Sequence, residues 1–145
     1  MAASIAIANR QRLLPLDRPG LRALCRRILA EHGVEADLSL AYVDNAAICA
    51  LNARFLGRDD VTDVIAFPFD APGDNPLPGD NLLGEVVIST EKAIAEARRR
   101  RIPVERELAL YTAHGVLHLL GYDDHTPADR RRMRRAERQA LACAP

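Results

Sequence analysis

Three of the four histidines lie within twelve residues, between His114 and His125. His114 and His118 are four positions apart, so a helix projects both imidazoles from one face toward one metal ion. Gly121 is expected to end that helix, and the chain beyond it brings Asp124 and His125 within reach of the same point. Two helical ligands, a third from the next turn and a fourth position for water form the layout of a catalytic zinc site. We predict one Zn²⁺ per chain.

The residue after His114 limits which group can act as the general base. Zinc proteases with a His-Glu-x-x-His helix place their general base there, whereas this chain has Gly115. A peptidase with that base is disfavoured, and the base is metal-bound hydroxide alone or a carboxylate from elsewhere. Two histidines four apart on an apolar helix are also common as packing residues. The third histidine and the carboxylates close behind favour the metal site.

Three segments of the chain resemble the YbeY family of metal-dependent endoribonucleases and ribosomal RNA maturation factors. They are Leu51-Asn52 leading to Thr62–Pro68, then Leu83–Ser89, and the His-Gly-x-Leu-His-Leu-x-Gly-Tyr-Asp block at 114–123. The resemblance implies an α+β fold with a small mixed sheet and a three-histidine site on a zincin-like helix. It also implies cleavage of single-stranded RNA, in small-subunit ribosomal RNA maturation and ribosome quality control.

The same resemblance implies where the protein acts and with what. Its partners would be ribosomal RNA and the small ribosomal subunit, with ribosomal proteins and assembly GTPases as further partners, in the cytoplasm and without a membrane. Two other functions stay open. One is a ribosome-assembly binding factor with a mainly structural metal, and the other is a metallohydrolase with a non-nucleic substrate.

The chain departs from the family pattern at the third ligand. The family places that histidine six positions after the second one, where this chain has Asp124, followed by His125. We favour His125 as the third ligand because histidine is the commoner neutral ligand, with Asp124 as the alternative. Asp123 is expected to orient a ligand imidazole.

A second departure concerns the phosphate contact. Many family members have an arginine implicated in catalysis where this chain has Leu56. Arg58 and Arg54 are the candidate replacements, although a surface arginine is an equally good interpretation of each. The family's serine is replaced by Ala66, which removes any hydroxyl role at that position.

Two acidic residues and two arginine runs complete the candidate site. Asp63 and Glu85 are candidate bases or ligand-orienting residues, against the more ordinary roles of strand-end cap or solvated carboxylate. The arginines predicted to follow RNA are Arg98, Arg99, Arg100, Arg101, Arg130 and Arg131, with the second run extending to Arg135. Solvated helix faces are the alternative for both runs.

The net charge is zero, from 20 basic and 20 acidic residues, but the charge is unevenly distributed. Residues 1–35 carry six basic and three acidic side chains, residues 36–91 two and ten, and residues 92–145 twelve and seven. Asymmetry of this kind indicates a charged partner or a bound cation. The zero therefore does not exclude RNA.

The 145 residues, 48% of them hydrophobic, fit a single domain, 1–145. The pattern predicts one α+β domain, a small mixed four-stranded sheet with about five helices. Strands are expected at 4–8, 38–43, 62–67 and 82–89, a loop at 68–79, and helices at 19–31, 44–55, 89–101 and 103–120 and from 126 onward.

Composition also limits location. No run approaches the ~18 apolar residues of a membrane span, and no charged leader precedes the short apolar N-terminal stretch, so a cleaved signal peptide is not expected. Cys25, Cys49 and Cys143 are far apart and form no Cys-x-x-Cys pair. We expect them to be reduced thiols in a cytoplasmic protein.

Overall fold

A computed structural model describes residues 3–57, 62–69 and 82–142. The described elements follow the chain order β1 (Ile5–Asn9), α1 (Arg18–Glu31), β2 (Asp37–Val43), α2 (Asn45–Leu56), β3 (Val64–Pro68), β4 (Leu82–Ser89), α3 (Thr90–Arg100), α4 (Val104–Leu119) and α5 (Pro127–Ala142). The α+β class and the predicted strands and helices are confirmed within a few residues. The predicted loop at 68–79 lies almost entirely outside the described residues.

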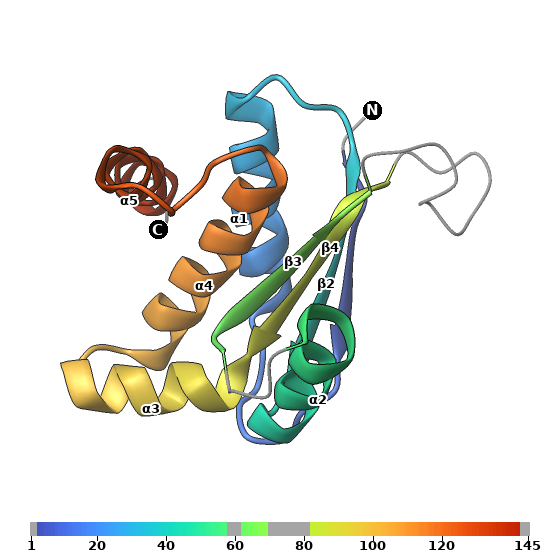
Figure 1. Cartoon of the computed structure of the whole chain (residues 1–145), viewed down its shortest axis with the longest axis vertical. Coiled ribbons are helices and arrows are strands. Elements are labelled where there is room, and N and C mark those ends of the chain that lie inside the picture. Colours follow the sequence, from blue (N-terminus) through green and yellow to red (C-terminus); the bar gives the residue numbers. More distant parts are fainter. Residues whose placement is uncertain (1–2, 58–61, 70–81, 143–145) are drawn as a thin grey trace.

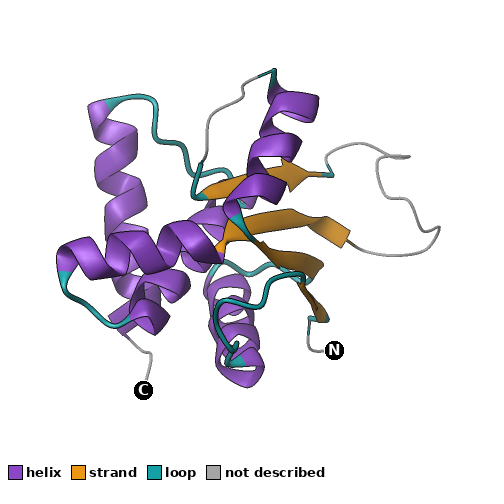
Figure 2. Ribbon diagram, turned by 90° about the horizontal axis from the view of Figure 1, so that it is seen from below, coloured by secondary structure: helices purple, strands orange, loops and turns teal. Residues whose placement is uncertain are grey.

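The sheet is mixed and its strand order is β1-β2-β4-β3. β1 and β2 pair in parallel, β2 and β4 pair in parallel, and β3 runs antiparallel to β4. Figure 2 shows the strands side by side in one twisted sheet. Because β4 lies inside the sheet, β1 and β3 are its two edges.

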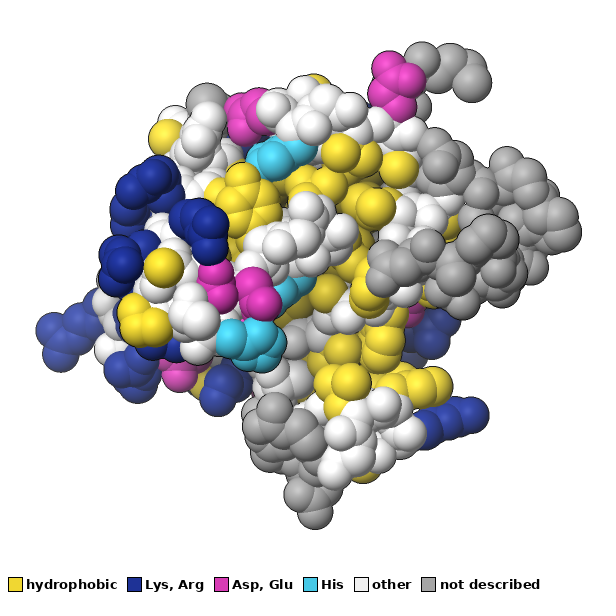
Figure 3. Space-filling view, turned by 45° about the horizontal axis from the view of Figure 1, so that its top comes forward, with side chains coloured by type: hydrophobic (Ala, Val, Ile, Leu, Met, Phe, Trp, Pro, Cys, Tyr) yellow, Lys and Arg dark blue, Asp and Glu magenta, His cyan; other side chains and the backbone are white. Residues whose placement is uncertain are grey.

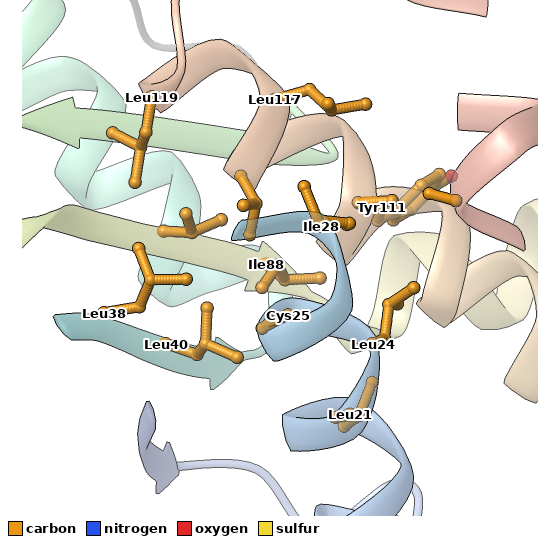
Figure 4. Close-up of a cluster of buried hydrophobic side chains, with 14 of the residues drawn as sticks. Leu21, Leu24, Cys25, Ile28, Leu38, Leu40, Ile88, Tyr111, Leu117 and Leu119 are labelled. Carbon is orange, nitrogen blue, oxygen red and sulfur yellow. The ribbon is translucent and has the colours of Figure 1, made fainter. Parts of the chain in front are cut away.

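The helices cover the two faces of the sheet unequally. α1 and α4 pack on one face with α5 beyond α4, and α2 lies on the other side (Figure 1). Alternation along β2 sends Leu38, Leu40 and Tyr42 into the larger core and Val43 into a smaller one with Ile48 of α2. Figure 4 shows α1 and α4 contributing most of the larger core.

α4 approaches the sheet very closely. A Cβ atom on Gly115 would overlap Cγ1 of Val86 and lie 2.9 Å from Cγ1 of Val64. The glycine therefore allows contact between helix and sheet at the turn that carries the histidines. Among the described residues, no helix is both long and apolar enough to cross a membrane.

Cys25 and Cys49 are free thiols, as expected from their spacing. Burial raises the pKa of Cys25 to about 12, so this thiol stays protonated and unreactive at neutral pH. Cys143 lies outside the described residues.

Candidate metal centre

α4 places the first two predicted ligands next to each other. The Nε2 atoms of His114 and His118 are 3.1 Å apart, and the ring centroids are 4.6 Å apart. The two side chains are 26% and 28% exposed, so they are anchored in the protein but open to solvent on one side. Two ring nitrogens this close need a proton or a cation between them, because facing lone pairs repel.

A carboxylate from α5 fixes the orientation of His114. Oε2 of Glu137 lies 2.6 Å from Nδ1 of His114, and the glutamate side chain is only 12% exposed. The Nδ1–H group donates to this carboxylate, which leaves the Nε2 lone pair facing His118. A carboxylate–histidine pair of this kind makes an imidazole a stronger metal ligand.

The charges around His114 act on its pKa. Burial lowers the pKa, but the hydrogen bond and charge of Glu137, together with the charges of Asp63 and Asp124, outweigh burial and raise it. The same negative groups that hold a protonated imidazole also favour a bound cation.

The turn after α4 brings Asp124 back to the histidines. Gly121 adopts φ = 103°, a conformation that favours glycine, and the N–H of Tyr122 donates to the carbonyl of Leu117 at 3.0 Å. The Tyr122 hydroxyl lies 2.8 Å from Nε2 of His32 at the end of α1. This contact ties the turn to a second helix.

Asp124 completes a triangle of ligand atoms. Its Oδ2 atom lies 3.7 Å from Nε2 of His114 and 3.5 Å from Nε2 of His118. Ligand atoms on a tetrahedral zinc ion, with bonds of 2.0–2.2 Å, lie about 3.3–3.6 Å apart. The three edges of 3.1, 3.5 and 3.7 Å therefore fit one such ion, and these residues form a candidate metal site.

Comparisons with known proteins identify the family. The model of the endoribonuclease YbeY family matches residues 6–144. The chain belongs to the endoribonuclease YbeY family. It is 46% identical over 119 residues to the Endoribonuclease YbeY of Anaeromyxobacter sp. (strain Fw109-5), a match that covers 81% of this chain and 59% of that protein.

Another relative and a solved structure extend the likeness over almost the whole chain. The Endoribonuclease YbeY of Alkaliphilus metalliredigens is 35% identical, with 97% of this chain and 95% of that protein covered. The solution structure of TM1509 from Thermotoga maritima matches the fold with a TM-score of 0.64 at 22% identity, covering 95% of this chain and 89% of that one.

In this YbeY-family chain the two candidates for third ligand lie in different surroundings. Asp124 joins the histidine pair, whereas the His125 side chain is 81% exposed and its Nε2 atom lies 3.2 Å from Oδ1 of Asp123. Asp123 thus contacts His125 and not a histidine of α4. Arg130 of α5 donates to the carbonyls of Asp124 and His125, at 3.4 and 3.2 Å, and anchors the turn.

The two acidic candidates lie in different places. Oδ1 of Asp63 accepts the N–H of Val64 at 2.8 Å, and its charge acts on His114, so it belongs to the surroundings of the site. Glu85 alternates with Val86 along β4 and contacts Ser39 on the opposite face of the sheet. The sheet therefore separates Glu85 from the histidines, and its expected role at the metal is not supported.

The two arginine runs also differ. The run on α5 borders the site, and Figure 3 shows Lys and Arg side chains gathered beside the acidic and histidine side chains. The run at the end of α3 lies near Val104, about 15 Å along α4 from His114 at 1.5 Å per residue. Within it, Arg99 pairs with Glu96 and Arg100 with the buried Glu107. Arg98 and Arg101 line a shallow hollow.

Only one of the two arginines proposed as phosphate contacts lies among the described residues. Arg54 is exposed at the end of α2, and Leu56 is 53% exposed. Arg58 lies outside the described residues.

Glu137 is the residue that the sequence interpretation missed. It occupies the buried stripe of α5, one turn after Met133 and three residues before Ala140. A glutamate inside an otherwise apolar stripe was the available signal, because a buried carboxylate requires a partner. No comparable pattern in the sequence indicates the contact between Tyr122 and His32.

Proposed function

We propose that this chain is a metal-dependent endoribonuclease that cleaves single-stranded RNA. Its cellular role, on this proposal, is maturation of small-subunit ribosomal RNA and ribosome quality control in the cytoplasm. The observation that carries the proposal is the triangle formed by His114, His118 and Asp124 in a chain of the YbeY family. Ribosomal RNA in the small subunit is the proposed substrate.

The donor set favours zinc. Nε2 of His114, Nε2 of His118 and Oδ2 of Asp124 would hold the ion, and two histidines with one carboxylate are a ligand set of zinc hydrolases. When bound in this way, zinc would lower the pKa of a water ligand to about 7 and polarise a phosphoryl oxygen. Iron(II) accepts the same donors, so the metal content is part of the test.

The chain's own residues would prepare and assist this chemistry. Glu137 keeps the proton of the neutral His114 ring on Nδ1, so that Nε2 of that ring presents its lone pair. Asp63, whose charge already acts on His114, is the proposed proton acceptor near the site. The exposed arginine Arg131, at the start of α5 beside the anchored Arg130, would attract the RNA backbone.

The test is metal content and RNA cleavage in wild type and the His114→Ala variant. Mass spectrometry should find one zinc per wild-type chain, and that protein should cleave a labelled single-stranded RNA. The variant should lose both while keeping its circular dichroism spectrum. Cleavage by the variant at the wild-type rate would refute the assignment.

A mainly structural metal predicts a different result. Removal of the metal would then unfold the protein, as in small zinc domains. We expect the metal-free chain to stay folded, because α4 is held by the buried residues Leu108, Val116 and Leu117 and not by its ligands. Unfolding on chelation, measured by circular dichroism, would favour the binding-factor alternative.

A further inference from the structure

An exposed aromatic cluster lies at the end of α2. The Phe55 side chain is 56% exposed, and its ring meets the ring of Phe67 edge-on, with centroids 5.8 Å apart and planes at 74°. The guanidinium carbon of Arg54 lies 5.2 Å from the centroid of the Phe55 ring. Phe67 meets the ring edge-on and the Arg54 cation lies over it, yet more than half of the Phe55 side chain stays exposed to a ligand.

This cluster and the metal centre lie on opposite sides of the same edge strand. Along β3, Val64 and Ala66 pack toward the core beneath α4, while Ile65 and Phe67 pack toward α2. Among the described residues β3 has no strand beyond it, so it is the edge strand between the histidines and Phe55. Figure 3 shows hydrophobic side chains on the surface between the histidines and α2.

The chemistry of the cluster fits a nucleobase. Every base has a π-face, so an open aromatic ring stacks on any of them, and a neighbouring arginine adds cation–π attraction and a phosphate contact. A flat apolar protein surface would leave the Arg54 charge without a complement. The phosphate backbone of RNA supplies that complement.

We propose that Phe55, supported by Phe67 and flanked by Arg54, is a stacking site for one base of a single-stranded RNA that crosses the β3 edge into the metal centre. This inference rests on the proposed function. Stacking reads no hydrogen-bond pattern, so the site holds a base without selecting its sequence.

Binding measurements test the role of the ring. We would follow fluorescence anisotropy of a labelled ten-nucleotide oligouridylate with the purified protein, checking on a gel that the RNA stays intact. Phe55→Ala is expected to weaken binding about 5- to 150-fold, and Phe55→Tyr to restore it. Because the side chain is exposed, the melting temperature should stay close to that of wild type.

A fluorescence probe tests stacking directly. The chain has no tryptophan, so Phe55→Trp creates a single reporter. Leu13→Trp is the matched control, since Leu13 is 54% exposed and lies beside Arg98 and Arg101. We expect the oligouridylate to quench the indole emission of the Phe55→Trp protein and to leave that of the Leu13→Trp protein nearly unchanged. An abasic oligomer of equal charge should quench neither.

The outcomes distinguish a failure of the stacking site from a failure of the proposed endoribonuclease function. A wild-type protein that neither binds nor cleaves single-stranded RNA refutes the proposed function. Wild-type cleavage together with unchanged affinity in Phe55→Ala refutes the stacking site alone. Quenching in the Leu13→Trp protein equal to or greater than that in the Phe55→Trp protein also refutes it, because the strand would then follow the α3 arginines.

Discussion

The two edge strands of the sheet, β1 and β3, differ in whether side chains bond to their outward backbone groups. At the β1 edge, the outward carbonyls of Ala3, Ile5 and Ile7 each accept a hydrogen bond from an arginine of α1. The donors are Arg26 at 3.1 Å, Arg22 at 3.0 Å and Arg18 at 3.3 Å, respectively. The spacing matches because four helical residues rise about 6 Å and two strand residues about 6.6 Å. Another strand cannot add here without displacing three guanidinium groups.

The β3 edge has no such cover among the described residues. Bonds from Ser89 N–H to Asp63 and from Phe69 N–H to Leu83 fix the ladder, so residues 64, 66 and 68 turn their polar groups outward. Val64 N–H is bonded to the Asp63 side chain, and Pro68 has no N–H. The open edge is the one beside the candidate metal centre.

The contrast shows that only one of the two sheet edges has its outward carbonyls covered by arginine side chains, among the described residues. Arg18, Arg22 and Arg26 of α1 are donors that close an edge, while Arg130 of α5 donates to the turn that carries Asp124. A count of basic residues in either segment does not separate these roles. The hydrogen-bond partners do.

The largest expected effect is a loss in the free energy of unfolding when proline is placed in β3. It shows which backbone groups of that strand face outward. Ile65→Pro removes a ladder hydrogen bond and disturbs a side chain only 5% exposed, so it should cost about 3 kcal/mol or more. Ala66→Pro removes an outward N–H and should cost clearly less. Urea denaturation of the two variants makes the comparison, and equal losses would contradict the register.

The next effect concerns the third ligand. Asp124→Ala should weaken zinc binding by more than the 10- to 100-fold that loss of an outer hydrogen-bond partner costs. His125→Ala, the matched control one residue away, should change it by no more than about twofold, as for an exposed side chain. Competition with a chelating dye measures both. The reverse result would restore His125 as the ligand.

Glu137→Gln should have a somewhat smaller effect, about 10- to 100-fold on zinc affinity. NMR titration of the metal-free protein supplies a second readout. The raised pKa of His114 should fall in the variant, because the strongest group favouring the protonated imidazole is gone. The contribution of the His114–Glu137 pair to the free energy of unfolding is fully present below the ordinary histidine pKa, near 6.5. It is lost as the pH rises through the raised pKa of His114. An unchanged pKa would exclude the pair as its cause.

The smallest expected effect lies at the closed edge. Replacing Arg18, Arg22 and Arg26 together with alanine should cost about 1–2 kcal/mol, since each bond is at least partly exposed. Zinc binding and RNA cleavage should persist, while light scattering on warming should show earlier self-association than in wild type. Loss of cleavage with normal stability would join this edge to the functional surface.

Local signals in the sequence determined most of the elements. Asp44 caps α2 by accepting the N–H of Ala47, and Ser89 caps α3 by accepting the N–H of Lys92, so a short polar side chain stands at the start of each helix. The buried residues of α1 also recur at helical spacing in the sequence. The position of β4 between β2 and β3 had no local signal, because strand order depends on contacts between distant segments.

The same division holds for the candidate site. The pairing of His114 and His118 follows from helical spacing alone. The inward turn of Asp124 depends on the conformation at Gly121 and on the contact between Tyr122 and His32, ninety residues away in sequence. No pattern around position 124 encodes that contact, so the sequence alone could not predict that Asp124 lies beside the two histidines.

The close packing at Gly115 bears on how this chemistry changes in evolution. Converting the helix to the zinc-protease pattern requires a glutamate at that position, and any side chain there overlaps Val86 and crowds Val64. One substitution therefore cannot install the base, because the strand residues beneath it would have to shrink in the same lineage. The close fit of this helix against the sheet thus excludes the zinc-protease base from position 115.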